Sequence, residues 1–305
     1  MQQNPKNRSE STSGGLRPWI GIGLLFMSAM GFSINTVIIK MAFEDGLDVN
    51  TANAVRHMVV VVVLFLFLKI RKRQLKLPPR ERYTGLALGT SVFMLGIGYL
   101  NAAKYLPLSL AILIIYTAPF FVAIIARFTE REPITFIRLI AIIFAFLGLA
   151  LALKVDSAAA LNWRGVAFAL IAAIGIASLV TISSVTMRTA DPQAVNFHCL
   201  VAGALLFAAF LSFTGGPAAS ITQSGWIKLG VASMGLALGY ITLFTGLEII
   251  GPLKSSMLMN MEPILTIILA ALLLGERLSS VQWIGAGLVI VGIFLITGAF
   301  RKIHS

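Results

Sequence analysis

Long apolar segments recur along the whole chain and constrain its fold more than any other feature. Ten of them are long enough to cross roughly 30 Å of hydrocarbon as a helix. We predict spans at residues 19–39, 50–69, 82–103, 108–128, 135–153, 164–187, 193–213, 225–247, 253–274 and 280–299. Only 12% of residues are charged, against about 25% in soluble domains, so the polar shell of a soluble fold is missing. The sequence therefore predicts an all-α integral membrane protein with ten transmembrane helices.

Basic residues are divided unevenly between the two sets of loops. Ten spans put both termini on one side, and that side holds 17 of the 24 Lys and Arg residues, many of them between Lys69 and Arg82. Because cytoplasmic loops carry excess Lys and Arg, we expect residues 1–16 and 301–305 to be cytoplasmic tails, the first of them disordered. The net charge of +12 then needs no nucleic-acid partner.

The chain also contains an internal repeat. A shift of 144 positions superimposes Trp19 on Trp163, Gly21 on Gly165, Gly31 on Gly175, Pro119 on Pro263, Glu132 on Glu276 and Gly148 on Gly292. Near the second span the shift becomes 141, which matches His57 with His198. We predict two five-helix repeats, at residues 17–155 and 156–300. Five is an odd number, so the second repeat enters the membrane from the opposite side, and inverted repeats of this kind are typical of secondary transporters.

Several short motifs resemble one known family. They are Ala54-Val55-Arg56, Leu106-Pro107-Leu108-Ser109, Asn260-Met261-Glu262-Pro263 and Leu274-Gly275-Glu276-Arg277-Leu278. Together with the repeat, they make the chain similar to the EamA-domain branch of the drug/metabolite transporter (DMT) superfamily from Trp19 to Ala299. The resemblance implies an inner-membrane carrier that moves small metabolites, often outward. The first repeat departs from the pattern, with Thr117-Ala118-Pro119 lacking a carboxylate before the proline and Glu130-Arg131-Glu132-Pro133 in place of a Gly-Glu-Arg motif.

Glu262 is the sharpest candidate for a functional residue, because it lies in the middle of a predicted span. A central acidic residue costs about 2.5 to 3.5 kcal/mol on insertion scales, so it should face protein or a water-filled cavity. One interpretation is a proton-coupling group or a contact for a substrate ammonium. The other is a carboxyl group that is hydrogen-bonded to a neighbouring helix and holds the two halves together.

Other candidates follow from their depth and their chemistry. Pro119 and Pro263 should kink their spans, either to free backbone carbonyls for substrate or for packing alone. The polar residues predicted to share a substrate cavity with Glu262 are Asn35, Tyr99, Asn101, Tyr116, Thr117, Tyr240 and Asn260. A shared cavity is the favoured interpretation for Tyr116, Thr117 and Asn260. For the second-rank candidates Asn35, Tyr99, Asn101 and Tyr240, a hydrogen bond between helices is at least an equal alternative.

Three basic residues near span ends are candidate gates. Arg56 could attract an anionic substrate group, pair with Glu44, Asp45 or Asp48, or place its charge at the membrane interface. His57 and His198 could titrate near neutral pH, although hydrogen-bonded helix-end histidines are commoner.

The pattern favours a secondary transporter that works by alternating access between two halves and moves small metabolites such as amino acids or related compounds, and the resemblance implies that it exports them. An uptake carrier of the same fold is the alternative. A membrane-embedded enzyme or a channel is less favoured, since no catalytic constellation or ring of pore charges is visible. No cofactor and no metal site is expected. The expected partners are the substrate and the lipid bilayer, with protons and a homodimer left open.

Overall fold

The structure is a computed structural model that describes residues 17–106, 108–129, 136–153, 162–214, 221–274 and 279–298. Both predicted tails, residues 1–16 and 301–305, lie outside the described residues. So do Glu132 and Glu276 of the matched loop motifs.

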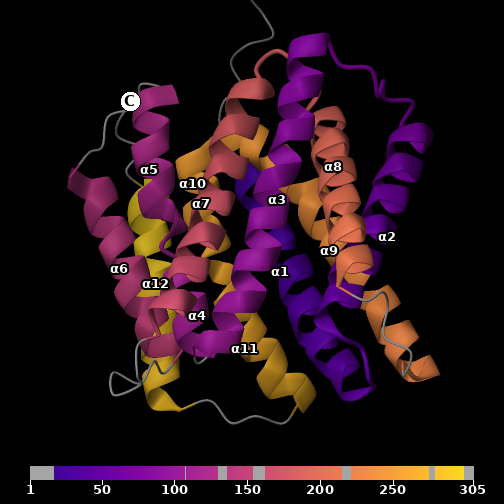
Figure 1. Cartoon of the computed structure of the whole chain (residues 1–305). Helices are drawn as coiled ribbons and strands as arrows, with labels where there is room; N and C mark the ends of the chain where they lie inside the picture. Colours follow the sequence, from indigo (N-terminus) through magenta and orange to yellow (C-terminus); the bar gives the residue numbers. More distant parts are fainter. Residues whose placement is uncertain are drawn as a thin grey trace, which may run out of the picture.

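The described residues form twelve helices (Figure 1). Their bounds are α1 Arg17–Glu44, α2 Val49–Ile70, α3 Pro79–Tyr105, α4 Leu108–Ile115, α5 Ala118–Thr129, α6 Phe136–Ala152, α7 Trp163–Thr186, α8 Pro192–Phe213, α9 Gln223–Ile250, α10 Pro252–Met259, α11 Met261–Leu274 and α12 Ser280–Gly298. Helices α4 and α5 together occupy the fourth predicted span, and α10 and α11 occupy the ninth. The twelve helices therefore make up the ten spans of the predicted membrane fold.

Length and hydropathy support the membrane assignment. Seven segments of at least 18 residues are long and apolar enough to cross a membrane, and one of them runs through α4 and α5 from Ala111 to Thr129. Shorter apolar stretches lie within α6 and α12. Helix α3 has 27 residues, which is long enough to span, but it begins with the charged residues Arg80, Glu81 and Arg82. Its apolar part begins beyond these charges.

The two repeats are inverted. In Figure 1, α4 lies below α5, whereas α10 lies above α11, so the two broken spans run in opposite directions. A shift of 144 residues maps the bounds of α4 onto those of α10 without any change. The odd number of spans in each repeat, inferred from the sequence, is the physical reason for this inversion.

The inverted repeats are related by an approximate two-fold rotation, and pairs of close helix crossings follow this two-fold relation. A Cβ atom placed on Gly31 of α1 would lie 2.6 Å from the carbonyl oxygen of Gly235 in α9. A Cβ atom on Gly175 of α7 would lie 2.8 Å from the carbonyl oxygen of Ser91 in α3. Since 31 and 175 differ by 144, as do 91 and 235, the α1–α9 and α7–α3 crossings are the same contact used twice.

Helices α6 and α12 pack on each other through a second pair of related glycines. A Cβ atom on Gly148 would meet the carbonyl oxygen of Gly285 at 2.7 Å, and one on Gly292 would meet that of Ala141 at 2.8 Å. These positions are again 144 apart. Small residues that allow backbones this close are the usual means of helix association in membranes.

The register of α2 and α8 corrects one detail of the predicted repeat. Asp48 caps α2 by accepting from the backbone N–H groups of residues 50 and 51, and Asp191 caps α8 in the same way. Both helices have 22 residues, so their offset is 143 and not 141. The predicted equivalence of His57 and His198 is therefore wrong, because the shorter loop before α8 removes one residue and not three.

Packing groups the helices across the two repeats. Helix α9 packs on α1 and α2, and α1 also packs on α10 and α11. In the related group, α3 packs on α7 and α8, and α7 also packs on α4 and α5. We call the first group bundle A (α1, α2, α9, α10, α11) and the second bundle B (α3, α4, α5, α7, α8); the two bundles also contact each other, chiefly through α2 with α8 and α10 with α5. Each bundle combines helices from both repeats.

Candidate functional site

A cavity of about 190 Å³ lies between the two bundles, and we call it the central cavity. Bundle A lines it with Phe32, Asn35, Thr36, Arg56, His57, Leu236, Tyr240, Leu243, Ser256, Met259 and Glu262, and with Asn260 between α10 and α11. Bundle B lines it with Val92, Leu95, Gly96, Tyr99, Ile115, Ala118, Ile176, Leu179 and Val180, and with Tyr116 between α4 and α5.

Equivalent residues of the two repeats line the central cavity. Nine pairs of lining residues differ by 144 positions: 32 and 176, 35 and 179, 36 and 180, 92 and 236, 96 and 240, 99 and 243, 115 and 259, 116 and 260, and 118 and 262. The four other lining residues are Arg56, His57, Leu95 and Ser256. Both repeats therefore supply the same backbone positions to one space.

The two helix breaks border this space. Pro119 is the second residue of α5 and Pro263 the third of α11, so each lies in the first turn of the second half-helix, where a missing N–H is tolerated. Neither proline can donate to the carbonyl four residues earlier, at Ile115 or Met259. Both of these residues line the cavity. The prolines themselves are not among its lining residues.

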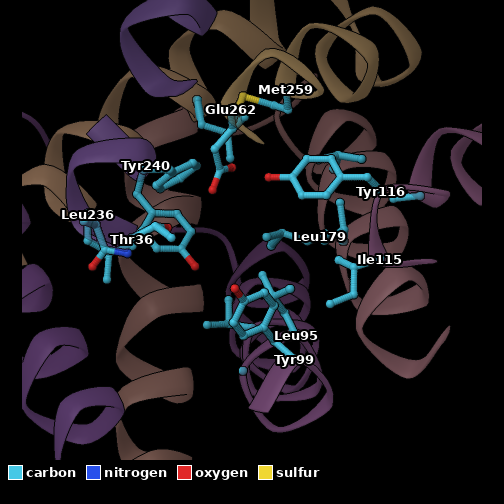
Figure 2. A pocket seen from close by; sticks show the side chains of 18 of the residues that line it. Thr36, Leu95, Tyr99, Ile115, Tyr116, Leu179, Leu236, Tyr240, Met259 and Glu262 are labelled. Carbon is cyan, nitrogen blue, oxygen red and sulfur yellow. The ribbon is translucent and has the colours of Figure 1, made fainter. Parts of the chain in front are cut away.

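Glu262 enters the cavity from the second position of α11 (Figure 2). Its backbone carbonyl accepts a hydrogen bond of 2.8 Å from the hydroxyl of Ser33 in α1, which fixes the start of α11 against bundle A. In Figure 2 its carboxylate and the Tyr116 hydroxyl point toward each other from opposite sides of the space. No ion pair among the described residues involves Glu262.

Three tyrosines converge on the same space. Tyr99 comes from α3, Tyr116 from the α4–α5 break and Tyr240 from α9 (Figure 2). The Tyr240 ring packs edge-to-face on Phe32 at a centroid distance of 5.3 Å, which leaves its orientation set by α1. Tyrosines offer both an aromatic face and a hydroxyl to a bound molecule.

Arg56 is held in the cavity by two amides. One terminal nitrogen donates to the side-chain oxygen of Asn35, at 3.5 Å, and the other donates to that of Asn53. Its half-buried side chain makes no ion pair with any described residue. Asn53 was not predicted, although its spacing of three residues from Arg56 on one helix could have revealed it.

The acidic residues proposed as partners of Arg56 have other roles. Asp45 forms an ion pair of 2.7 Å with Lys228 of α9, and Asp48 caps α2. Glu44, at the end of α1, does not pair with Arg56 either. Arg56 is the eighth residue of α2, about 10 Å along the helix from its start, which puts it out of reach of the cap.

The two predicted gate histidines lie in different surroundings. Nδ1 of buried His57 donates to the carbonyl oxygen of Asn53 at 2.7 Å, and the ring stacks on Phe207. His57 lines the cavity. His198 is outside its lining, and its Nδ1 donates to the carbonyl oxygen of Ala194 at 2.8 Å.

Two other predicted residues also lie outside the lining. The Thr117 hydroxyl donates to the carbonyl of Ile114 at 2.6 Å, and the Asn101 amide donates to that of Ile97 at 2.9 Å. Both side chains satisfy the backbone of their own segment. The structure thus brings together Asn35, Arg56, His57, Tyr99, Tyr116, Tyr240, Asn260 and Glu262 from the predicted set.

The two walls of the cavity differ in polarity even though their backbones are related. Where bundle A has Asn35 and Thr36, bundle B has Leu179 and Val180. Where bundle A has Glu262, bundle B has Ala118. Both charged lining residues, Arg56 and Glu262, belong to bundle A. The cavity can therefore take a small molecule whose polar end faces bundle A and whose apolar part faces bundle B.

Comparison with known proteins identifies the family. Residues 19–154 and residues 163–298 each match the EamA-like transporter family, so two copies of this domain together cover most of the chain. Each match lies within one of the two repeats inferred from the 144-residue shift.

Curated relatives are named transporters. The chain is 25% identical over 214 residues to an uncharacterized transporter of Archaeoglobus fulgidus, covering 68% of this chain and 74% of that protein. It is 33% identical over 143 residues to an uncharacterized transporter of Synechocystis, covering 46% and 43%. It is 25% identical over 193 residues to the uncharacterized transporter YxxF of Bacillus subtilis, covering 61% and 60%.

A solved crystal structure has the same fold. It superposes on 93% of this chain and 99% of its own with a TM-score of 0.80, at 17% identity. The resemblance inferred from the sequence motifs is therefore confirmed at the level of family and fold. With two matched domains in inverted orientation around one central cavity, the chain belongs to the EamA-like transporter family of the DMT superfamily and is a membrane transporter of small molecules.

Proposed function

We propose that this transporter is a secondary active carrier that exports small amphipathic metabolites, such as amino acids or related compounds, by alternating access. The observation that carries the proposal is the central cavity, which the two inverted repeats line with nine pairs of equivalent residues. Two related halves around one site provide two similar conformations that open to opposite faces. A cavity with a polar and an apolar wall suits a molecule that has both characters.

The packing suggests which bodies move. Sequence order alone favours the two repeats as the moving parts, but bundles A and B each combine helices from both repeats. We infer that these bundles rock against each other around the cavity. The breaks at Tyr116 and Asn260 lie where the bundles meet, and they let each half-helix tilt separately.

Glu262 is the proposed coupling residue. It faces Tyr116 from the α4–α5 break, and Tyr99, Tyr240 and Arg56 line the same cavity from α3, α9 and α2. A carboxyl group in this setting can exchange a proton or bind a substrate ammonium, and it does not need to hold both at once. Alternating between the two ligands would link proton entry to metabolite export.

The membrane orientation is part of the proposal. The α2–α3 loop, rich in Lys and Arg, lies at the end of the molecule opposite the α1–α2 turn and so at the end where α1 begins (Figure 1), and Arg73 there pairs with Asp191 at 2.7 Å. The positive-inside rule places this end in the cytoplasm and thus both termini with it. We also propose the inner membrane of a bacterial-type cell, as the resemblance of the sequence motifs implies.

Transport in proteoliposomes tests the carrier. Purified protein should accelerate uptake of a labelled metabolite when the lumen holds the same unlabelled compound, because a carrier returns faster when loaded. Candidate metabolites come from a toxicity screen of cells with and without the protein, in which resistance indicates export and sensitisation indicates import. A channel would show flux without this trans-stimulation.

Replacing Glu262 with glutamine separates its two proposed roles. An imposed proton gradient should accelerate transport by the wild type and leave Glu262→Gln unaffected. If Glu262 binds protons only, the variant keeps counterflow; if it also binds a substrate ammonium, counterflow falls as well. Glu248→Gln, at an exposed acidic position of α9, is the matched control and should behave as the wild type. A wild-type gradient response in Glu262→Gln would remove the coupling role.

A further inference from the structure

Arg56 carries a positive charge into the membrane-spanning part of the molecule. It is the eighth residue of α2 and lines the central cavity with a half-buried side chain. Placing an arginine at such depth costs free energy. Arginines are found there mainly where they face a water-filled space and have a partner of opposite charge.

The described part of the protein supplies no such partner. Asn35 and Asn53 bind the guanidinium, and both are neutral amides. Glu262 lines the same cavity, yet it is not in an ion pair with Arg56. Arg56 therefore has its orientation fixed by the protein while its charge is left uncompensated.

Part of the hydrogen-bonding capacity of Arg56 is also unused. Its buried Nε finds no hydrogen-bond partner among the described residues, and the side-chain oxygen of Asn260, another lining residue, is in the same situation. A guanidinium offers five N–H donors in a planar fork that matches the two oxygens of a carboxylate. A bound carboxylate can accept from the remaining N–H groups of the two terminal nitrogens, and its charge offsets that of Arg56.

Comparison of Arg56 with the equivalent position in the second repeat argues against a purely structural role for Arg56. At the register of 143 residues, the equivalent of Arg56 in α8 is Cys199, which is buried and uncharged. Asn53, in contrast, has a matching amide at Asn196. The fold therefore builds the same helix without the guanidinium, and the charge is an addition on one side of the cavity only.

We propose that Arg56 is the residue that binds the anionic group of the substrate, and that this group is a carboxylate. The inference rests on the proposed carrier function and specifies its substrate chemistry. One guanidinium balances one negative charge, whereas a phosphate monoester carries about 1.5 to 2 at neutral pH. A carboxylate on Arg56 leaves Glu262 for an ammonium group, and the apolar remainder faces Leu179 and Val180 of bundle B.

Paired compounds test this inference in proteoliposomes. The probes are L-leucine, L-phenylalanine and L-threonine, each compared with its primary amide, which keeps the amine and side chain but loses the carboxylate charge. Wild-type protein should transport at least one acid with a KM at least about tenfold below that of its amide, as expected for a charge-assisted hydrogen-bonded pair.

Three variants locate the preference. Arg56→Gln should abolish the acid-over-amide ratio, and Arg56→Lys should keep part of it, because the charge remains and the fork is lost. Asn35→Asp puts a carboxylate beside Arg56, where it competes with that of the substrate. This third variant adds a counter-charge and so favours folding; it should remove most of the acid-over-amide ratio, because the new carboxylate competes with the carboxylate of the acid and the amide has none.

The ratio of acid to amide is the decisive readout, since misfolding lowers both rates together. Equal transport of acid and amide by the wild type, or an acid preference retained in Arg56→Gln, would show that Arg56 is not the anion site, while the carrier proposal would stand. Transport of no acid in the panel would also overturn the inference. The carrier proposal fails separately, if no compound from the toxicity screen shows trans-stimulation.

Discussion

The contact between α1 and α9 joins the two repeats within bundle A, and one glycine tests it. At Gly31 a methyl group would lie 2.6 Å from the carbonyl oxygen of Gly235 and 2.9 Å from the backbone nitrogen of Gly239. Both atoms belong to the backbone of α9, so no side-chain rotation can make room. We predict that Gly31→Ala forces α1 and α9 apart.

The size of the effect follows from the distances. Against an ordinary contact of 3.4 Å, the methyl group of Gly31→Ala is short by 0.8 Å and that of Gly175→Ala, with its nearest atom at 2.8 Å, by 0.6 Å. Overpacking of this kind costs about 1 to 3 kcal/mol. Gly23 has nothing within 4 Å of an added Cβ, so Gly23→Ala gains helix propensity and loses nothing. We therefore expect Gly23→Ala to be the most stable of the three variants, Gly175→Ala to be less stable, and Gly31→Ala to be the least stable.

The protein supplies its own probe for this measurement. Cys199 is the single cysteine of the chain, and its exposed fraction is 1%. A thiol-reactive fluorescent dye should therefore report unfolding when purified protein in detergent is heated. At roughly 2 °C per kcal/mol for a chain of this size, Gly31→Ala should unfold about 2 to 6 °C below the wild type. Gly23→Ala should unfold at or above the wild-type temperature.

Gly31→Ala as stable as Gly23→Ala would refute the reasoning, because it would mean that α1 and α9 do not cross at this glycine. A larger loss in Gly175→Ala than in Gly31→Ala would contradict the ranking by distance. Counterflow gives a second readout, since a bundle whose helices are forced apart should transport more slowly even at temperatures where it stays folded.

Two further predictions concern the loops at the two ends. Lys228 holds the pKa of Asp45 below its ordinary value through a hydrogen bond, so the pair stabilises the folded state above about pH 4 and loses this contribution as the pH falls through the folded-state pKa. Asp45→Asn should thus unfold earlier than wild type at pH 7, and the difference should shrink below pH 4; an equal difference at pH 3 would contradict the role of the charge. In intact cells an impermeant maleimide should label Glu44→Cys and leave Leu75→Cys unlabelled, with buried Cys199 silent; labelling of both would refute the proposed orientation.

The sequence already contained the architecture, because its signals are local or periodic. Hydropathy marks each span by itself, and the odd number of spans per repeat dictates inversion without any knowledge of contacts. The prolines at 119 and 263 are equally local signals, since a missing N–H alters the helix in which it occurs. The helices break at Tyr116 and Thr117 and at Asn260, two to three residues before each proline.

The features that could not be predicted are those that depend on which helices pack against each other. Thr117 and Glu262 lie at similar predicted depths, yet Thr117 bonds to its own segment and only Glu262 reaches the cavity. The pairing of α1 with α9 across the repeats has no signal in local hydropathy. The register of α2 and α8 was also missed, because a match of two histidines says less than matched helix caps at Asp48 and Asp191.

The asymmetry of the cavity bears on the energetics of transport. Inverted repeats make the two end states alike in backbone packing, but Arg56 and Glu262 both belong to bundle A, while bundle B meets the cavity through apolar side chains and the tyrosines at 99 and 116. A substrate whose charged groups stay with bundle A keeps these contacts while bundle B moves past it. Breaking a buried ion pair is far more costly than sliding an apolar surface. If the bundles rock against each other as proposed, placing both charges on one bundle lowers the barrier between the two states, whereas splitting them between the bundles would hold the cavity shut.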